Sequence, residues 1–187
     1  ALATAHRQRH HNFRQAASPG LAELAEAMQA ESPESLITSL QTQAYPGVVY
    51  TDYSRNAIDA VLDDLERFHR ELATLPDPQA ALNRLPERII LSPLRSGPIG
   101  TDTLNAEMTR RLGHAVNRHT QAILITENVP RLGLSNGDIG LIWQSAEGFH
   151  AHFLGPSGLN SLPVAKLPAH EPAYALTIHK AQGSEFD

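Results

Sequence analysis

The chain carries two hydrophobic patterns, and each predicts a different kind of element. Apolar residues three or four positions apart predict amphipathic helices over residues 19–30, 58–72, 78–85 and 103–112. Short apolar runs between turn residues predict strands over residues 88–94, 121–126, 139–144, 150–154, 162–164 and 173–178. Residues 41–53 are predicted as a loop, with Pro46-Gly47 as its turn.

The order of these elements predicts an α/β fold with an inserted all-β segment. The strand at 88–94, the glycine turn after it and the helix at 103–112 form half of a βαβ unit, which predicts a parallel sheet with flanking helices. Close spacing of the later strands predicts a small β-barrel, with Trp143 in its core rather than serving as a platform for base stacking. We therefore expect residues 1–115 and 171–187 to form one domain and residues 116–170 to form the barrel.

Composition limits the classes of function. The net charge is −5, so a protein that holds nucleic acid by general phosphate neutralisation is disfavoured, and any DNA contact must come from a local site. The absence of cysteine excludes disulfides and cysteine-based zinc sites. No apolar stretch approaches the ~20 residues of a membrane span, so we expect no membrane contact. The absence of cysteine suits a cytoplasmic protein, and we expect that location. The first residue is not Met and both ends look cut, as in a piece of a longer protein.

Candidate chemistry gathers at the end of the chain, in TIHKAQGSEFD (residues 177–187). Here polar residues follow directly after a predicted strand. In α/β sheets, ligands bind at the carboxyl ends of the strands. The segment supplies a hydroxyl, an imidazole ring, a cation and a carboxylate suited to ribose hydroxyls, around a turn where backbone can approach a ligand. An ordinary strand exit with solvated polar residues would have the same composition, and the residues alone leave both interpretations open.

This eleven-residue segment is similar to motif V of superfamily 1 helicases, in the variant found in the RecD subunits of exodeoxyribonuclease V. The resemblance implies that Thr177, His179 and Lys180 face single-stranded DNA. It also implies that a second group faces the nucleotide, namely Gln182, Gly183 and Glu185.

Three further segments resemble the same family in the same order. Residues 12–15 (NFRQ) are similar to helicase motif IV, which implies that Arg14 is the catalytic arginine that reaches the γ-phosphate of ATP. Residues 95–105 (RSGPIGTDTLN) and 134–140 (LSNGDIG) are similar to two RecD-type segments, which makes Arg95 and Asn136 candidate DNA contacts. Arg95 could instead cap nearby carbonyls, and Asn136 could belong to a simple hairpin turn.

The resemblance implies a RecA-like second motor domain, of the P-loop-NTPase type, with an SH3-like β-barrel insert. The full protein would be an ATP-dependent 5′→3′ DNA helicase that uses ATP and Mg²⁺, acts with RecB-like and RecC-like partners and serves double-strand-break repair and recombination. This sequence lacks the G-x-x-x-x-G-K-[ST] pattern of a P-loop, so the segment alone is not expected to hydrolyse ATP or to hold a bound cofactor. We expect no metal site.

Two other classes of function stay open. The barrel and its α/β base could form a module that binds nucleic acid or a protein without nucleotide. His6, His10 and His11 could serve a metal-dependent enzyme, since His6 and His10 have helical i, i+4 spacing, although a solvated linker is favoured. A P-loop encoded upstream of this segment would favour the helicase over the binding module. The metal content of the purified protein would test the metal-dependent enzyme.

Overall fold

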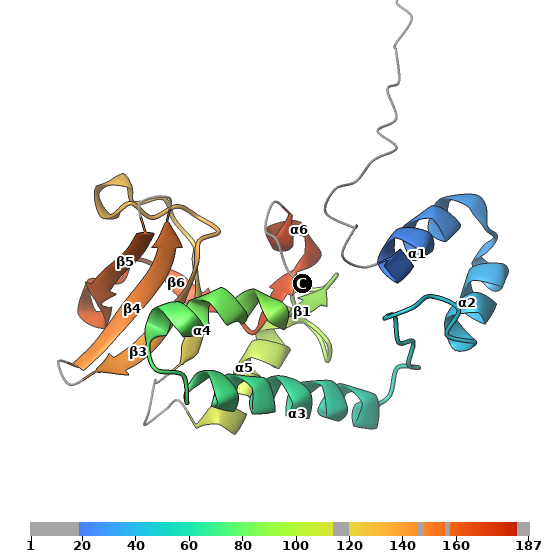
Figure 1. Cartoon of the computed structure of the whole chain (residues 1–187), viewed down its shortest axis with the longest axis horizontal. Helices are drawn as coiled ribbons and strands as arrows, with labels where there is room; N and C mark the ends of the chain where they lie inside the picture. The colour runs from blue at the N-terminus through green and yellow to red at the C-terminus, as the bar shows by residue number, and fades with distance from the viewer. Residues whose placement is uncertain (1–18, 114–119, 146–147, 156–157, 183–187) are drawn as a thin grey trace, which may run out of the picture. The chain divides into compact units, whose positions relative to one another are not determined.

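The structure is a computed structural model, and it describes residues 19–113, 120–145, 148–155 and 158–182. These residues form two compact units (Figure 1). The first contains the described residues up to Ile58, and the second contains those from Asp59 onward.

The first unit contains two short helices, α1 (Pro19–Ala30) and α2 (Pro33–Gln41). The Pro19–Ala30 helix agrees with the prediction, whereas no element was predicted at α2. No residue of α2 is fully buried, and its apolar side is short, with only Leu36 and Leu40 half-buried at helical spacing. The N-terminus of α2 is stabilised by capping. The Ser32 side chain accepts a hydrogen bond from the Ser35 amide at 3.3 Å, and proline occupies the first helical position.

The second unit begins with helices that bury one apolar face. Helix α3 (Arg55–Leu72) runs into this unit and buries Leu62, Leu65, Phe68 and Leu72 at helical spacing. Helix α4 (Pro78–Arg84) starts at Asp77, whose carboxylate accepts a hydrogen bond from the Ala80 amide at 2.8 Å, and a 3-10 helix (Leu85–Glu87) follows.

A parallel pair of strands confirms the α/β class. Strands β1 (Ile90–Ser92) and β7 (Ala175–Thr177) pair in parallel, so both end at the same edge. Helix α5 (Thr101–Leu112) follows β1 and packs against β7, and α6 (Ile178–Ala181) follows β7 directly. The RecA-like assignment goes beyond this pair and stays a prediction.

The segment between α5 and β7 forms an antiparallel sheet. Its strand order is β5-β4-β3-β2-β6. The strands, in chain order, are β2 (Gln121–Ile125), β3 (Ile139–Ser145), β4 (Gly148–Gly155), β5 (Gly158–Pro163) and β6 (His170–Pro172). Two further 3-10 helices, Pro130–Leu132 and Val164–Lys166, lie in the connections.

The prediction of a closed barrel is wrong for the described residues, because this sheet is open. Strands β5 and β6 form its two edges and do not pair with each other. Strand β6 has three residues, and its Pro172 has no backbone N–H to donate. The ladder therefore ends at β6 and does not continue round to β5.

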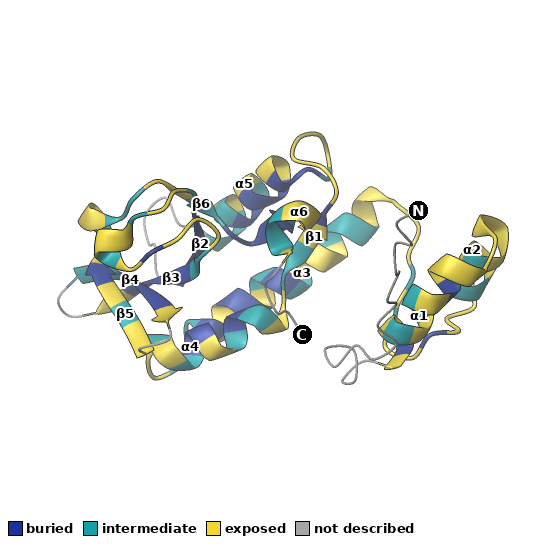
Figure 2. Cartoon of the chain, turned by 90° about the horizontal axis from the view of Figure 1, so that it is seen from above, coloured by how far each residue is buried: buried dark blue, intermediate teal, exposed yellow. Residues whose placement is uncertain are grey.

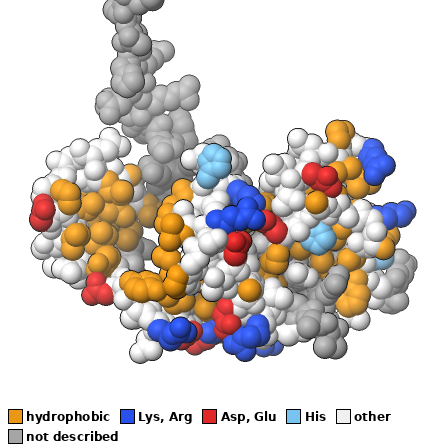
Figure 3. All heavy atoms as spheres, turned by 180° about the vertical axis from the view of Figure 1, so that it is seen from behind, with side chains coloured by type: hydrophobic (Ala, Val, Ile, Leu, Met, Phe, Trp, Pro, Cys, Tyr) orange, Lys and Arg blue, Asp and Glu red, His pale blue; other side chains and the backbone are white. Residues whose placement is uncertain are grey.

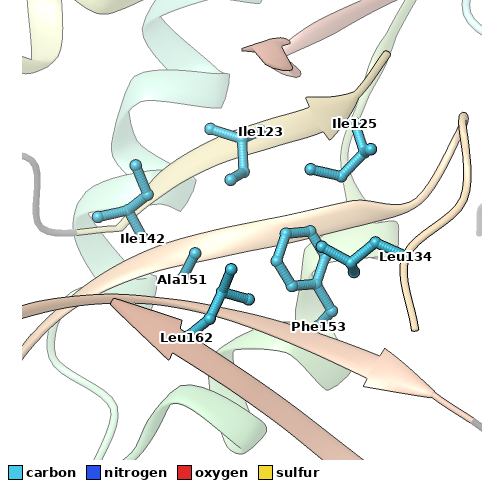
Figure 4. Close-up of a cluster of buried hydrophobic side chains, with 7 residues drawn as sticks. All are labelled: Ile123, Ile125, Leu134, Ile142, Ala151, Phe153 and Leu162. Atoms are coloured by element: carbon cyan, nitrogen blue, oxygen red, sulfur yellow. The ribbon is translucent and has the colours of Figure 1, made fainter. Parts of the chain in front are cut away.

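Part of the core of the unit lies on the faces of this sheet. One face carries a cluster of apolar side chains (Figure 4): Ile123, Ile125, Leu134, Ile142, Ala151, Phe153 and Leu162. Helix α4 packs against β3 and β4. Strands β2 and β3 are buried over most of their length, whereas α1 and α2 are mostly exposed (Figure 2). Trp143 is 8% exposed, in keeping with the predicted core position, although the sheet is not closed. Within the described ranges, no helix has the length and apolar character that a membrane span requires.

Candidate functional site

A hollow of about 350 Å³ opens where the parallel strands end. Its walls come from α5, β6, β7, α6 and the loop after β1. The lining residues are Arg95, Thr101, Asp102, Asn105, Ala106, Glu171, Pro172, Ala175, Leu176, Thr177, His179 and Lys180. The hollow therefore lies at the edge of the parallel pair where α/β proteins bind ligands.

The glycine turn between β1 and α5 forms one wall. Gly97 has φ 98°, a conformation that favours glycine, and a Cβ on Gly100 would lie 2.5 Å from the Ser96 carbonyl carbon. The Thr101 and Asp102 amides donate to the carbonyls of Leu94 and Arg95 at 3.1 and 3.0 Å. These two amides therefore already have acceptors inside the turn and are not free to bind a ligand.

Asn105 of α5 holds β7 in place with one buried side chain. Its Oδ1 accepts from the Tyr174 and Ala175 amides at 3.0 and 2.9 Å, and its Nδ2 donates to the Ala175 carbonyl at 2.9 Å. The side-chain amide thus supplies the hydrogen bonds that a neighbouring strand would make. Asn105 fixes the strand that leads into the polar tail.

Helix α6 presents the polar tail to the hollow. The Thr177 hydroxyl caps this helix by accepting from the Lys180 amide at 3.3 Å. The Lys180 ammonium group donates to Glu171 of β6, and the two side chains are about one third exposed. The second cation of the hollow, Arg95, lies 3.6 Å from Asp102. Two cations thus face two carboxylates in one hollow, and the space-filling view shows basic and acidic side chains lying side by side (Figure 3).

Helix α5 is anchored to α3 by a charge network away from the hollow. Arg111 forms ion pairs with Asp59 at 2.9 Å and with Asp63, both on α3, and with Glu107 on its own helix at 2.9 Å. Hydrogen bonds from Arg110 and then Arg111 lower the pKa of Glu107 to about 2. This network orients the helix that carries Asp102 and Asn105.

The structure brings four of the predicted site residues together. Arg95, Thr177, His179 and Lys180 come from two segments far apart in the sequence, and all line the hollow. Gln182 lies at the C-cap of α6, exposed and outside the lining. Several predicted residues fall outside the described residues, namely Arg14, Gly183 and Glu185, and also His6, His10 and His11.

Asn136 lies in a turn and does not line the hollow. Its backbone amide donates to the Asn128 side chain at 2.8 Å, and the Ser135 amide donates to the Asp138 carboxylate at 2.7 Å. These bonds fit the hairpin-turn alternative, and a DNA contact at Asn136 stays a prediction.

Three residues of the hollow whose hydrogen bonds or ion pairs are described above had been given no role by sequence reasoning, namely Asp102, Asn105 and Glu171. Asp102 and Asn105 lie in the RecD-like segment at 95–105, so a signal for them was present. Glu171 had no signal, because β6 is a three-residue edge strand without an alternating pattern. Across the part of the chain that the structure describes, no three His, Asp or Glu side chains are grouped to hold a metal ion.

The fold and the site define an α/β protein with a hollow of ligand size at the ends of two parallel strands, in which charged side chains lie among apolar ones. No family model matches the chain. It is 34% identical over 125 residues to "RecBCD enzyme subunit RecD" of Mycolicibacterium smegmatis, a match that covers 63% of this chain and 22% of that protein.

Two further curated proteins show the same relationship. The subunit of the same name from Haemophilus influenzae is 36% identical over 105 residues, 51% of this chain and 15% of that protein. "ATP-dependent RecD2 DNA helicase" of Deinococcus radiodurans is 30% identical over 106 residues, 52% of this chain and 15% of that protein. The predicted resemblance is confirmed: the chain is a homologue of RecD and RecD2 proteins over about half its length or more. It spans about a fifth of the length of these relatives, or less.

Proposed function

We propose that this chain is a second-motor-domain segment of a RecD-type, ATP-dependent DNA helicase, and that its hollow holds part of a single DNA strand. One observation supports this most strongly. Four residues that were assigned to DNA from two separate sequence segments line a single hollow, Arg95 from one segment and Thr177, His179 and Lys180 from the other. The names of the homologues supply the class of activity, since they include a RecD subunit and a RecD2 DNA helicase.

Each lining side chain has chemistry suited to a DNA strand. Lys180 and Arg95 supply cations for phosphate oxygens, and the guanidinium of Arg95 can pair with phosphate through two N–H groups. His179 is exposed at the rim and offers a ring on which a base can stack. Thr177 lies at the strand end and lines the same hollow. The hollow would hold a few atoms of backbone and base and not a long tract.

The nucleotide side of the proposal concerns other residues. We assign Arg14 to the γ-phosphate and Gln182, Gly183 and Glu185 to nucleotide sensing, on the resemblance alone. ATP and Mg²⁺ would be held mainly by a P-loop domain that this sequence does not contain. The segment by itself would therefore not hydrolyse ATP.

The wider proposal follows the homologues. Residues 1–115 and 171–187 would form the RecA-like domain and residues 116–170 its SH3-like insert, here as an open sheet. The full protein would move 5′→3′ on single-stranded DNA in the cytoplasm. RecB-like and RecC-like subunits would be its partners in double-strand-break repair, since two homologues are named as subunits of the RecBCD enzyme.

Replacement of Lys180 tests the proposed DNA site. In the full-length protein, Lys180→Ala is expected to weaken binding of a fluorescently labelled oligo-dT about fivefold to tenfold and to reduce the salt slope by about 1, because one phosphate contact is lost. Fluorescence anisotropy over a range of salt concentrations measures both quantities. Lys166→Ala, in a 3-10 helix that does not line the hollow, is the matched control. Equal binding by Lys180→Ala and the control would refute a DNA site here.

A further inference from the structure

The two cations of the hollow already have anionic partners from the protein itself. Lys180 donates to Glu171, and Arg95 lies 3.6 Å from Asp102. All four side chains line the same hollow, so its formal charges cancel. A hollow that simply attracted polyanions would not need carboxylates among its lining residues.

We infer that Glu171 and Asp102 act as built-in counter-anions, which a DNA phosphate must displace from Lys180 and Arg95. This rests on the proposed function, because it assigns those cations to DNA. Binding is then an exchange of partners: each cation leaves a carboxylate of the protein and meets a phosphate oxygen. The carboxylates lower the affinity and set how easily the strand is released.

The two ion pairs, Lys180–Glu171 and Arg95–Asp102, differ in strength. The side chains of Lys180 and Glu171 are 33% and 32% exposed, whereas those of Arg95 and Asp102 are 69% and 58% exposed. Solvent and salt screen an exposed pair more than a half-buried one. Glu171 is therefore the main counter-anion, and Asp102 is the weaker one.

The place of Glu171 in the fold adds a second consequence. Strand β6 is hydrogen-bonded to β2 at the edge of the antiparallel sheet, and Glu171 stands opposite Leu124. Lys180 belongs to α6, which follows the parallel strand β7. The ion pair thus joins the two sheets through the DNA site, so occupation of the site by phosphate would break a contact between them.

A double-mutant cycle in the full-length protein tests the exchange. Glu171→Gln is expected to raise the affinity for labelled oligo-dT about threefold to tenfold, since it frees Lys180. The same substitution in a Lys180→Ala background is expected to give much less gain, because the cation it would free is absent. Glu87→Gln is the matched control: this carboxylate is ion-paired with Arg84, has a similar exposure and does not line the hollow.

The outcomes separate this inference from the proposed function. If Lys180→Ala has no effect on binding, the proposed DNA site fails, and the inference fails with it. If Lys180→Ala weakens binding but Glu171→Gln gives no gain, only the counter-anion role is overturned. An equal gain with and without Lys180 also overturns it, because Glu171 would then act by general repulsion. Should Glu171→Gln not fold, as judged by thermal unfolding, Asp102→Asn with and without Arg95→Ala gives the same cycle with a smaller expected gain.

Discussion

A single side chain, Asn105, makes the backbone hydrogen bonds that a strand beside β7 would otherwise make. Buried backbone groups need hydrogen-bond partners, and among the described residues no strand lies beside β7 on the side that faces α5. The carboxamide has both an acceptor and a donor, so it can satisfy two amides and one carbonyl of β7 at once. An aspartate lacks the donor and a leucine lacks both groups, which explains the need for asparagine at this position.

Removal of this side chain should loosen the strand that carries the site. Asn105→Ala leaves two amides and one carbonyl of β7 without their partner, and we expect a loss of about 3 kcal/mol in the free energy of unfolding. Denaturant titration measures this loss. Asn83→Ala, at an exposed position of α4, is the control and should change the free energy by less than about 0.5 kcal/mol. A loss at Asn105 no larger than that of the control would contradict the role of this residue.

At the scale of elements, the turn from β1 to α5 depends on a close approach of backbone to backbone. A Cβ on Gly100 would lie 2.5 to 2.6 Å from backbone atoms of Ser96 and Arg95, which cannot move without opening the turn. Gly100→Ala should therefore destabilise the unit by about 2 kcal/mol and also weaken oligo-dT binding, because Arg95 and Asp102 flank the turn. Thermal unfolding and anisotropy are the measurements. Ala60→Gly, at an exposed position of α3 that does not line the hollow, is the comparison, since it should cost about 1 kcal/mol without a clash. Full retention of stability by Gly100→Ala would show that the turn is not this tight.

The junction of α3 and α5 should respond to acid through Glu107. Its pKa in the folded protein is lowered to about 2 from its ordinary value of 4.5, by hydrogen bonds from the Arg110 and Arg111 guanidinium groups. A lowered pKa means that the stabilisation is complete above about pH 4.5 and is lost as the pH falls toward 2. The difference in unfolding free energy between the native protein and Glu107→Gln should thus be constant from pH 5 to 7 and shrink at lower pH. Denaturant titrations across this range measure it, and a difference that does not change with pH would contradict the assignment.

At the scale of the whole molecule, the proposal places Arg14 at the nucleotide. In the full-length protein, Arg14→Ala should leave oligo-dT binding unchanged and lower ATP turnover about 10³-fold, since a guanidinium that stabilises the γ-phosphate contributes this much in related chemistry. A coupled ATPase assay measures the turnover. Arg9→Ala, in the same N-terminal segment, is the control, and unchanged turnover in Arg14→Ala would remove Arg14 from the proposed mechanism.

The sequence by itself determined the class of fold, most of the elements and part of the site. Helical spacing placed the amphipathic helices, and short apolar runs placed the strands of both sheets except β6 and most of β5, which was predicted at residues 162–164 and is found at Gly158–Pro163. The motif-like segments located Arg95, Thr177, His179 and Lys180 before any geometry was known. These features are local, since each depends on residues within one turn or one strand, and local pattern is what a sequence shows directly.

Only the tertiary structure decided that the sheet is open and that the hollow carries no net charge. The first depends on whether two edge strands meet, and the second on Glu171, which a three-residue edge strand brings next to a lysine nine positions later. Helix α2 was also decided by capping and not by a buried stripe. Contacts between segments depend on how the elements pack together. The pattern of residues within one element therefore does not show which charged side chain of another element will lie opposite.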